Sequence, residues 1–546
     1  MKQLLVRFLS LVFVATIYCI PALTQDGIRI TGVPLANQRS GHPDNVLSPG
    51  FALVKIAEGT DKLENPSGLI TNFGFLNDAS VQPFEATHTE ADENLYLVFD
   101  HNLGGPTQGY DYGRHYLFQG HENGVPLAYV TRINLDVTDP AHRITLLTPV
   151  NANGVTGFGS IDGSTWNPFT RTLLFTQERG SGGGVIEITP EWPSQVRTLD
   201  GILGKGGYEG IHPDNRGNIF IVEDVGGTTV NIDPTNPNSP KAARQPNSFL
   251  YRFVPKDITD LTKGGILQAL QVSINGTPLV FGANPSADVF SDAQLQLHTL
   301  GSHWPVRWIN VHDSRACAPA CASFNANAEA KTAGATPFQR PENGVFRPGA
   351  DFHTFFFDAT GDTNALSGGV PALAARGAWG SIFRVDFSES GNDGLISIFV
   401  LGDAAHASFD NLSFADRHTL LAAEDRGDGL HAQLNTLDSV WAFRVEGDGD
   451  ADPRDDFTDA RFIALGRDTV SEHDAALLGT PGFQNDGDNE PTGLYISDGA
   501  TSIQRLLGSK RNLEDARWFV TQQHGNNQVW EIVRQNDDRH EHGDRD

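Results

Sequence analysis

Short apolar runs that end in polar side chains recur six times along the chain. These runs are residues 93–101, 171–178, 217–224, 353–360, 418–425 and 517–524. Each is followed by a second run with alternating apolar residues, at 128–135, 183–190, 248–255, 380–387, 439–446 and 528–535. Alternation with a period of two is typical of strands that bury one face. A sixfold strand repeat predicts an all-β fold, a six-bladed β-propeller.

The spacing between the repeats is uneven, which predicts long inter-strand insertions. One insertion is residues 226–247, and a longer one is residues 285–341. The pattern divides the chain into four parts. We expect a signal peptide at 1–24, an N-terminal entry segment of the propeller at 25–80, the six-bladed propeller at 81–535 and a disordered polar tail at 536–546, which contains no apolar residue.

A carboxylate lies just before five of the six runs: Glu85, Glu209, Glu342, Asp410 and Glu490. The corresponding stretch of the second repeat, residues 163–166, has no acid. The innermost strands of a propeller line its tunnel, so these side chains are expected to converge at one mouth. A ring of like charges is costly unless a cation fills it. Any single acid could equally cap a turn, but recurrence at one repeat position favours a metal site.

Further polar residues end the runs themselves: His101, Glu178, Asp224, Glu424, Asp425 and His524. Hard oxygen donors with few imidazoles suit Ca²⁺ first, then Mn²⁺ or Fe³⁺. Arg340 stands two residues before Glu342, and residues two apart on a strand face the same side. An arginine beside a metal-binding acid can clamp a phosphate. The alternative is a surface ion pair that contributes little stability.

Charge and export signals narrow the range of partners. The net charge is 39 − 67 = −28, which argues against nucleic acid and anionic membranes. Lys2 and Arg7 precede an apolar stretch at 8–20, and a small-x-small pattern at 22–24 suits cleavage before Gln25. We therefore expect a secreted or periplasmic monomer, exported by the general route. Cys317 and Cys321 could form a small-loop disulfide in an oxidising compartment, with free thiols as the alternative.

Several segments together resemble the PhoX-type alkaline phosphatases, secreted six-bladed propellers with a calcium and iron centre. The matching segments are residues 163–178, 208–224, 340–342, 410–425, 490–493 and 522–525, in the same order as in the family. The resemblance extends through nearly the whole mature chain. Its more specific pieces are Arg340-Pro341-Glu342 and Gln522-Gln523-His524-Gly525.

The resemblance implies particular roles for these residues. Glu178, Glu209 and Glu342 would bind metal, Arg340 would contact phosphate, and acids such as Asp410 and Glu490 would bind calcium. The chain is a divergent member by this comparison, because the family's cysteine iron ligand corresponds to Gln177. A neutral amide cannot replace a thiolate, so calcium is the expected cofactor and iron is doubtful.

Three functions remain open from the sequence. The first is a metal-dependent phosphomonoesterase acting on a small phosphorylated substrate, with Arg340 and Glu342 as catalytic residues. The second is another calcium-dependent propeller hydrolase, such as a lactonase or a phytase-like esterase. The third is a non-catalytic propeller with structural calcium. Arg340 and the metal acids favour the first.

Overall fold

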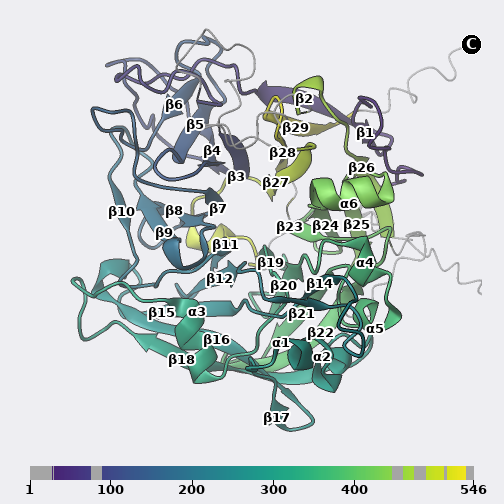
Figure 1. Ribbon diagram of the computed structural model, residues 1–546. Helices are drawn as coiled ribbons and strands as arrows, with labels where there is room; N and C mark the ends of the chain where they lie inside the picture. Colours follow the sequence, from purple (N-terminus) through teal and green to yellow (C-terminus); the bar gives the residue numbers. More distant parts are fainter. Residues whose placement is uncertain are drawn as a thin grey trace, which may run out of the picture.

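The computed structural model consists mainly of antiparallel β-strands arranged around a central axis (Figure 1). It describes residues 28, 30–75, 89–445, 459–471, 487–509, 513 and 515–535. The predicted all-β class is confirmed. Within these residues no helix is long and apolar enough to cross a membrane. The expected signal peptide, the polar tail and Glu85 lie outside the described residues.

The described strands form sheets of five, four, ten, two, four and four strands, and within them most strands fall into six antiparallel groups of four, which we call units. The first unit is β3 (Glu90–Val98), β4 (His115–Glu122), β5 (Tyr129–Asn134) and β6 (Ile144–Leu146). The second is β7 (Ile161–Asn167), β8 (Thr172–Gln177), β9 (Gly184–Ile188) and β10 (Val196–Thr198). The third is β11 (Tyr208–Pro213), β12 (Ile219–Glu223), β15 (Leu250–Pro255) and β16 (Gly265–Ile274).

The other three units complete the circle. The fourth is β19 (Gly344–Phe346), β20 (Thr354–Ala359), β21 (Ser381–Phe387) and β22 (Asp393–Leu401). The fifth is β23 (Phe409–Phe414), β24 (Thr419–Glu424), β25 (Ser439–Arg444) and β26 (Asp459–Ala464), with β1 (Val46–Leu47) at its edge. The sixth is β27 (Glu490–Ser497), β28 (Arg517–Gln523), β29 (Gln528–Arg534) and β2 (Phe51–Ala57).

The first strands of these units contact one another in a closed cycle: β3 with β7, β7 with β11, β11 with β19, β19 with β23, β23 with β27 and β27 with β3. Apolar clusters fill the spaces between neighbouring sheets; one of them joins Leu421 of β24 to Ile496 of β27. This arrangement supports the six-bladed count, which stays a prediction. It brings the starts of six inner strands toward one axis.

Two features join the units. In the sixth, β2 comes from the N-terminal segment and pairs with the last strand of the chain, β29. Between the third and fourth units lies the predicted long insertion. Its strand β18 (Trp304–Asp313) pairs with both β16 and β22, so the two units form one continuous sheet. The N-terminal strand β2 therefore completes the sixth unit, next to the first. Strand β18 joins the third and fourth units into one sheet.

The remaining elements are short and lie between the strands. They are β13 (Thr229–Asn231), β14 (Lys241–Arg244), β17 (Thr277–Pro278), α1 (Pro285–Val289), α2 (Asp292–Leu297), α3 (Ala326–Ala333), α4 (Ala365–Gly368), α5 (Pro371–Ala374), α6 (Gly427–Leu434), and the 3₁₀ turns η3 (Gly180–Gly182), η4 (Leu261–Lys263) and η5 (Ile503–Arg505). The helices α1, α2 and α3 belong to the long insertion, and Asn325 caps α3 by accepting from the N–H of Ala328 at 2.8 Å.

The repeat was predicted out of phase in the first unit. The runs at 171–178, 217–224, 353–360, 418–425 and 517–524 are second strands, namely β8, β12, β20, β24 and β28. The run at 93–101 instead overlaps β3, a first strand, and the true second strand β4 ends at Glu122. The alternating runs that follow are third strands in all six units. His101 is accordingly exposed beside Asp100, away from the inner strand starts.

Candidate metal centre and active site

The site begins with an irregularity repeated at the start of the inner strands. Between Tyr208 and Ile211 the register of β11 against β12 shifts, and two residues on β11 stand opposite one on β12. The same shift occurs between Ile161 and Ser164, between Ala91 and Asn94, and between Phe409 and Leu412. A β-bulge re-aims the side chains that it contains. The residues in these bulges include Asp92, Asp162, Glu209 and Asp410.

Carboxylates from neighbouring units meet in overlapping groups. Three groups have ligand atoms within 4.8 Å of one another: Asp92 with Glu122 and Asp162, Asp162 with Glu178 and Glu209, and Glu209 with Asp224 and Glu342. First-strand acids thus alternate with acids from second-strand ends. Together the seven carboxylates form a continuous belt across the first four units, which we call the acidic belt.

Arg340 lies at one end of the acidic belt. Its Nε donates to Asp224 Oδ2 at 2.9 Å, its Nη2 lies 3.0 Å from Glu342 Oε1, and its Nη1 donates to Thr363 Oγ1 at 2.9 Å. The side chain is 19% exposed, so part of it reaches solvent. The expectation that Arg340 and Glu342 share a strand face is wrong, although the two side chains do meet in an ion pair. Arg340 precedes β19 in a bend with φ +53° and does not share a strand face with Glu342.

Burial and mutual repulsion make the belt resist full ionisation. Burial raises the pKa of Glu178 to about 8; Asp224 adds to this rise and Arg340 opposes it. Burial raises the pKa of Asp92 to about 6, against hydrogen bonds from Thr492 and Gln523. The pKa values of Glu122, Asp162, Glu209 and Glu342 are raised well above the ordinary range by burial, with neighbouring acids as a further cause.

Asp410 and Glu490 lie on the side contributed by the fifth and sixth units. Burial raises the pKa of Asp410, and repulsion from Asp425 and Asp92 raises it further. Burial likewise raises the pKa of Glu490, with repulsion from Asp425, Asp410 and Asp92. His524 lies nearby, with Nε2 3.9 Å from Glu490 Oε2. Asp92 therefore repels both acids. Neither acid is a member of the three close carboxylate groups that form the belt.

The donor set fits a hard divalent cation. The belt offers only carboxylate oxygens, the ligands that Ca²⁺ prefers. Asp224 Oδ1 is buried with no hydrogen-bond partner among the described residues, and such an atom is costly to leave unpaired. Adding positive charge would relieve both this defect and the repulsion that raises the pKa values.

Of the predicted site residues, the structure brings together Glu178, Glu209, Arg340 and Glu342. Asp410 and Glu490 stay outside these groups, close enough to Asp92 for repulsion to raise their pKa values. Sequence reasoning missed Asp92, Glu122 and Asp162. The expectation that the second repeat lacks the acid is wrong, because Asp162 directly precedes the stretch at 163–166 that was compared. In the first unit, Asp92 and Glu122 were missed because the pattern placed the second strand at β3 instead of β4. The useful signal would have been an acid directly after the last paired residue before each bulge, as in Ala91-Asp92, Ile161-Asp162, Tyr208-Glu209 and Phe409-Asp410.

The side chains that decide whether a thiolate is available to bind iron can be seen in the structure. Gln177 is buried, and its Nε2 donates to the carbonyl of Gly159 at 3.0 Å. Cys317 and Cys321 form a disulfide with sulfur atoms 2.10 Å apart. The described residues therefore offer the belt no thiolate.

Comparisons with known proteins agree with the resemblance inferred from the sequence. A family model described as alkaline phosphatase PhoX matches residues 241–439. The fold is similar to that of Pseudomonas fluorescens PhoX in complex with vanadate, a transition state analogue, with 13% identity, a TM-score of 0.52, and coverage of 92% of this chain and 98% of that one. At this identity the likeness shows a shared fold.

A weaker similarity involves a candidate 6-phosphogluconolactonase of Bacteroides uniformis, with 10% identity, a TM-score of 0.25, and coverage of 66% of this chain and 80% of that one. No curated protein sequence matches the chain. The resemblance to PhoX-type alkaline phosphatases is confirmed, and the family match supports a phosphatase.

Proposed function

We propose that the chain is an exported, metal-dependent phosphomonoesterase of the PhoX type. The observation that carries the proposal is the contact between Arg340 and the acidic belt: one guanidinium lies among acids whose oxygens are spaced for a cation. Phosphoryl transfer needs positive charge on both sides of the phosphate oxygens. A cation in the belt and Arg340 beside it would supply that charge.

Arg340 is proposed as the residue that orients the phosphate. A guanidinium has five N–H donors. Asp224, Thr363 and Glu342 each take one, so two remain for a phosphate in the mouth. Asp224 and Glu342 hold the planar group in place before substrate binds, which reduces the entropy lost on binding. Glu342 is itself oriented by a hydrogen bond from Thr360 Oγ1.

Calcium is the cation proposed for the belt, held by Glu178, Glu209 and Glu342 together with Asp92, Glu122, Asp162 and Asp224. Asp410 and Glu490 are proposed as ligands on the opposite side, and Glu85 keeps its proposed role from the repeat pattern alone. When bound, a divalent cation supplies Lewis acidity toward water and phosphate oxygens. Iron is not proposed, because Gln177 offers a neutral amide that already donates to Gly159.

The test is hydrolysis of 4-nitrophenyl phosphate at alkaline pH by purified protein, with calcium or with chelator. We expect calcium-dependent turnover. Arg340→Ala should lower kcat on the order of 100-fold, the usual cost of losing one preorganised donor to transition-state charge. Arg340→Lys should not restore it, since an ammonium lacks the planar fork.

Arg315→Ala is the matched control, because Arg315 is an exposed arginine that pairs with Asp313 at 2.5 Å. It should leave kcat unchanged. If wild type is inert toward phosphate esters but binds calcium, the phosphatase proposal fails. A hydrolase acting on other esters or a non-catalytic calcium-binding protein would then replace it.

A further inference from the structure

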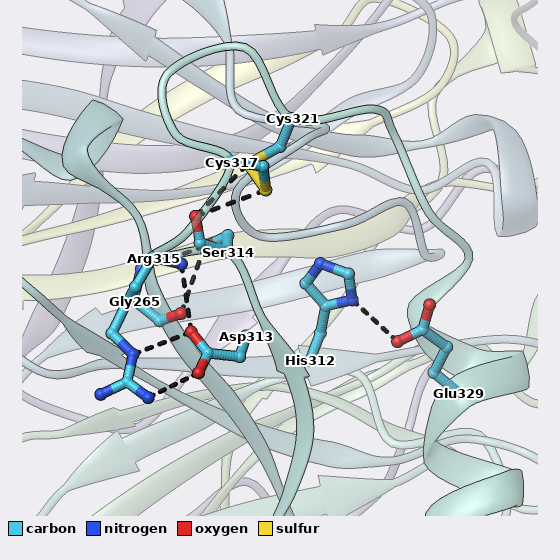
Figure 2. The surroundings of a disulfide bond; sticks show 8 residues. All are labelled: Gly265, His312, Asp313, Ser314, Arg315, Cys317, Cys321 and Glu329. Atoms are coloured by element: carbon cyan, nitrogen blue, oxygen red, sulfur yellow. Dashed lines mark hydrogen bonds and ion pairs between the residues drawn. A yellow bond between two sulfur atoms is a disulfide. The ribbon is translucent and has the colours of Figure 1, made fainter.

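The long insertion is anchored firmly before it reaches α3. Figure 2 shows the disulfide between Cys317 and Cys321 and, nearby, the contact of His312 with α3. His312 Nδ1 lies 2.9 Å from Glu329 Oε2, and its ring stacks on Phe324 at 3.6 Å between centroids. The backbone of Lys205 bonds to Phe324 and Ala326 at 2.8 and 2.9 Å. These contacts fix α3 against the third unit.

One buried side-chain amide of α3 bonds to Glu223, the residue that precedes Asp224 of the acidic belt. Asn327 is 8% exposed. Its Nδ2 lies 3.0 Å from Glu223 Oε2 and 2.7 Å from the carbonyl oxygen of Asn247. Lys331, one turn later, is close enough to lower the pKa of Glu223, although burial raises that pKa overall. Asn327 is thus the residue of α3 that bonds directly to this carboxylate, while Lys331 adds positive charge nearby.

Glu223 is an unusual group to bury at this position. It is fully buried, and its Oε2 also accepts from Phe249 N at 3.2 Å and from Tyr251 OH at 3.0 Å. Its Oε1 has no partner within the described residues. A buried carboxylate with half of its acceptor capacity unmet depends strongly on the donors it has. Loss of Asn327 would therefore be expected to move Glu223.

Both chain segments held by Asn327 lead to the proposed phosphate site. Glu223 immediately precedes Asp224, whose Oδ2 accepts from Arg340 Nε at 2.9 Å. Asn247, the other partner, donates its N–H to the carbonyl of Phe338 at 2.9 Å, two residues before Arg340. One amide therefore holds the side chain of Glu223, next to Asp224, and the backbone of Asn247, which bonds to the segment that leads to Arg340.

We propose that Asn327 is a positioning residue that sets the relative placement of Asp224 and Arg340. It acts through Glu223 on one side and through Asn247 on the other, and touches neither substrate nor cation. The long insertion thereby takes part in the reaction: its disulfide-anchored helix supports the arginine that orients phosphate. This inference rests on the proposed phosphatase function for its kinetic test only.

The experiment compares Asn327→Ala and Asn327→Gln with Thr332→Ala, a control at an exposed position of the same helix that loses only the hydrogen bond from Thr332 Oγ1 to the carbonyl of Ala328. At a temperature well below Tm, Asn327→Ala should lower kcat for 4-nitrophenyl phosphate about 10- to 100-fold, the range known for partners that orient site residues, with KM within about threefold of wild type. Asn327→Gln keeps a donor amide and should recover part of kcat. The control should match wild type.

Crystal structures of wild type and Asn327→Ala keep the two proposals separable. We expect the variant to lose the Asp224–Arg340 contact while the fold is retained. If wild type has no phosphatase activity, the proposed function fails and this structural comparison alone decides the role of Asn327. An unchanged Asp224–Arg340 pair, or a variant with lower Tm but wild-type kcat, would mean that Asn327 serves stability only and would overturn the inference.

Discussion

Individual acids were easier to predict than their partners. Glu209 and Glu342 were found because each stands just before a recognisable strand. Asp162 was missed although it occupies the equivalent place, because its neighbours were aligned one residue too late. In a bulge, two residues oppose one, so strict alternation cannot say which of the two faces the axis. The identity of the acid was readable from the sequence, but its direction depended on backbone geometry.

Asp162 belongs to two of the close carboxylate groups, so we predict a large effect of neutralising it. Asp162→Asn should weaken calcium binding on the order of tenfold or more, by analogy with changes around metal ligands. Calcium titration followed by the rise in Tm measures this, since a ligand that binds only the folded state raises Tm. Asp100→Asn, at an exposed acid, is the control. Equal calcium responses in both variants would argue against the belt as the binding site.

The raised pKa values predict a pH dependence with a definite sign. A carboxylate with a folded pKa above its unfolded value adds stability that is complete below the unfolded pKa and is lost as pH rises through the folded one. For Glu178 this window runs from its ordinary value of 4.5 to about 8. The Tm of the metal-free protein should therefore fall as pH rises through this window.

Calcium displaces protons from carboxylates, so the calcium-induced rise in Tm should be larger near the top of this window than near its bottom. Differential scanning calorimetry with chelator and with calcium, at the two ends of the window, checks both statements. A calcium effect independent of pH would contradict the pKa argument.

At the scale of elements, the strands were predicted well and their order within a unit less well. Apolar runs located β8, β12, β20, β24 and β28, but the inner strands β7, β11 and β23 carry glycine, asparagine or serine among their apolar residues and gave weaker patterns. Their side chains face a polar tunnel and neighbouring inner strands, so the usual apolar alternation is interrupted. This explains why the repeat was placed one strand out of phase at β3.

Gly163, inside the bulge of β7, should tolerate no side chain. A Cβ there would lie 2.2 Å from the carbonyl oxygen of Glu209, a backbone atom on the adjacent inner strand. Gly163→Ala should cost about 1–3 kcal/mol of stability, as overpacking usually does, and should also weaken calcium binding by displacing Glu209. Gly124→Ala, where nothing lies within 4 Å of the added atom, is the control. Equal Tm values for Gly163→Ala and Gly124→Ala would exclude this packing role.

At the scale of the whole molecule, packing of one unit against the next makes the site. The belt acids extend from Asp92 in the first unit to Glu342 in the fourth, and no local pattern could state that Asp92 and Glu122 lie near Asp162 of the next unit. Contacts between neighbouring inner strands bring the belt acids together, and contact of the sixth unit with the first adds Glu490 to the surroundings of Asp92. The repeat and the charges can be read from the sequence, whereas the distances between the carboxylates depend on how the sheets pack together.

The acidic belt is expected to be stable because a cation occupies it. Elemental analysis of purified wild type and of Glu209→Gln, a substitution of nearly equal volume at an acid shared by two of the close groups, measures this occupancy. We expect calcium bound to wild type at about one ion or more per chain, little or no iron, and a lower calcium content in the variant. Wild type free of divalent metal after equilibration with calcium, or equal metal in both proteins, would contradict it.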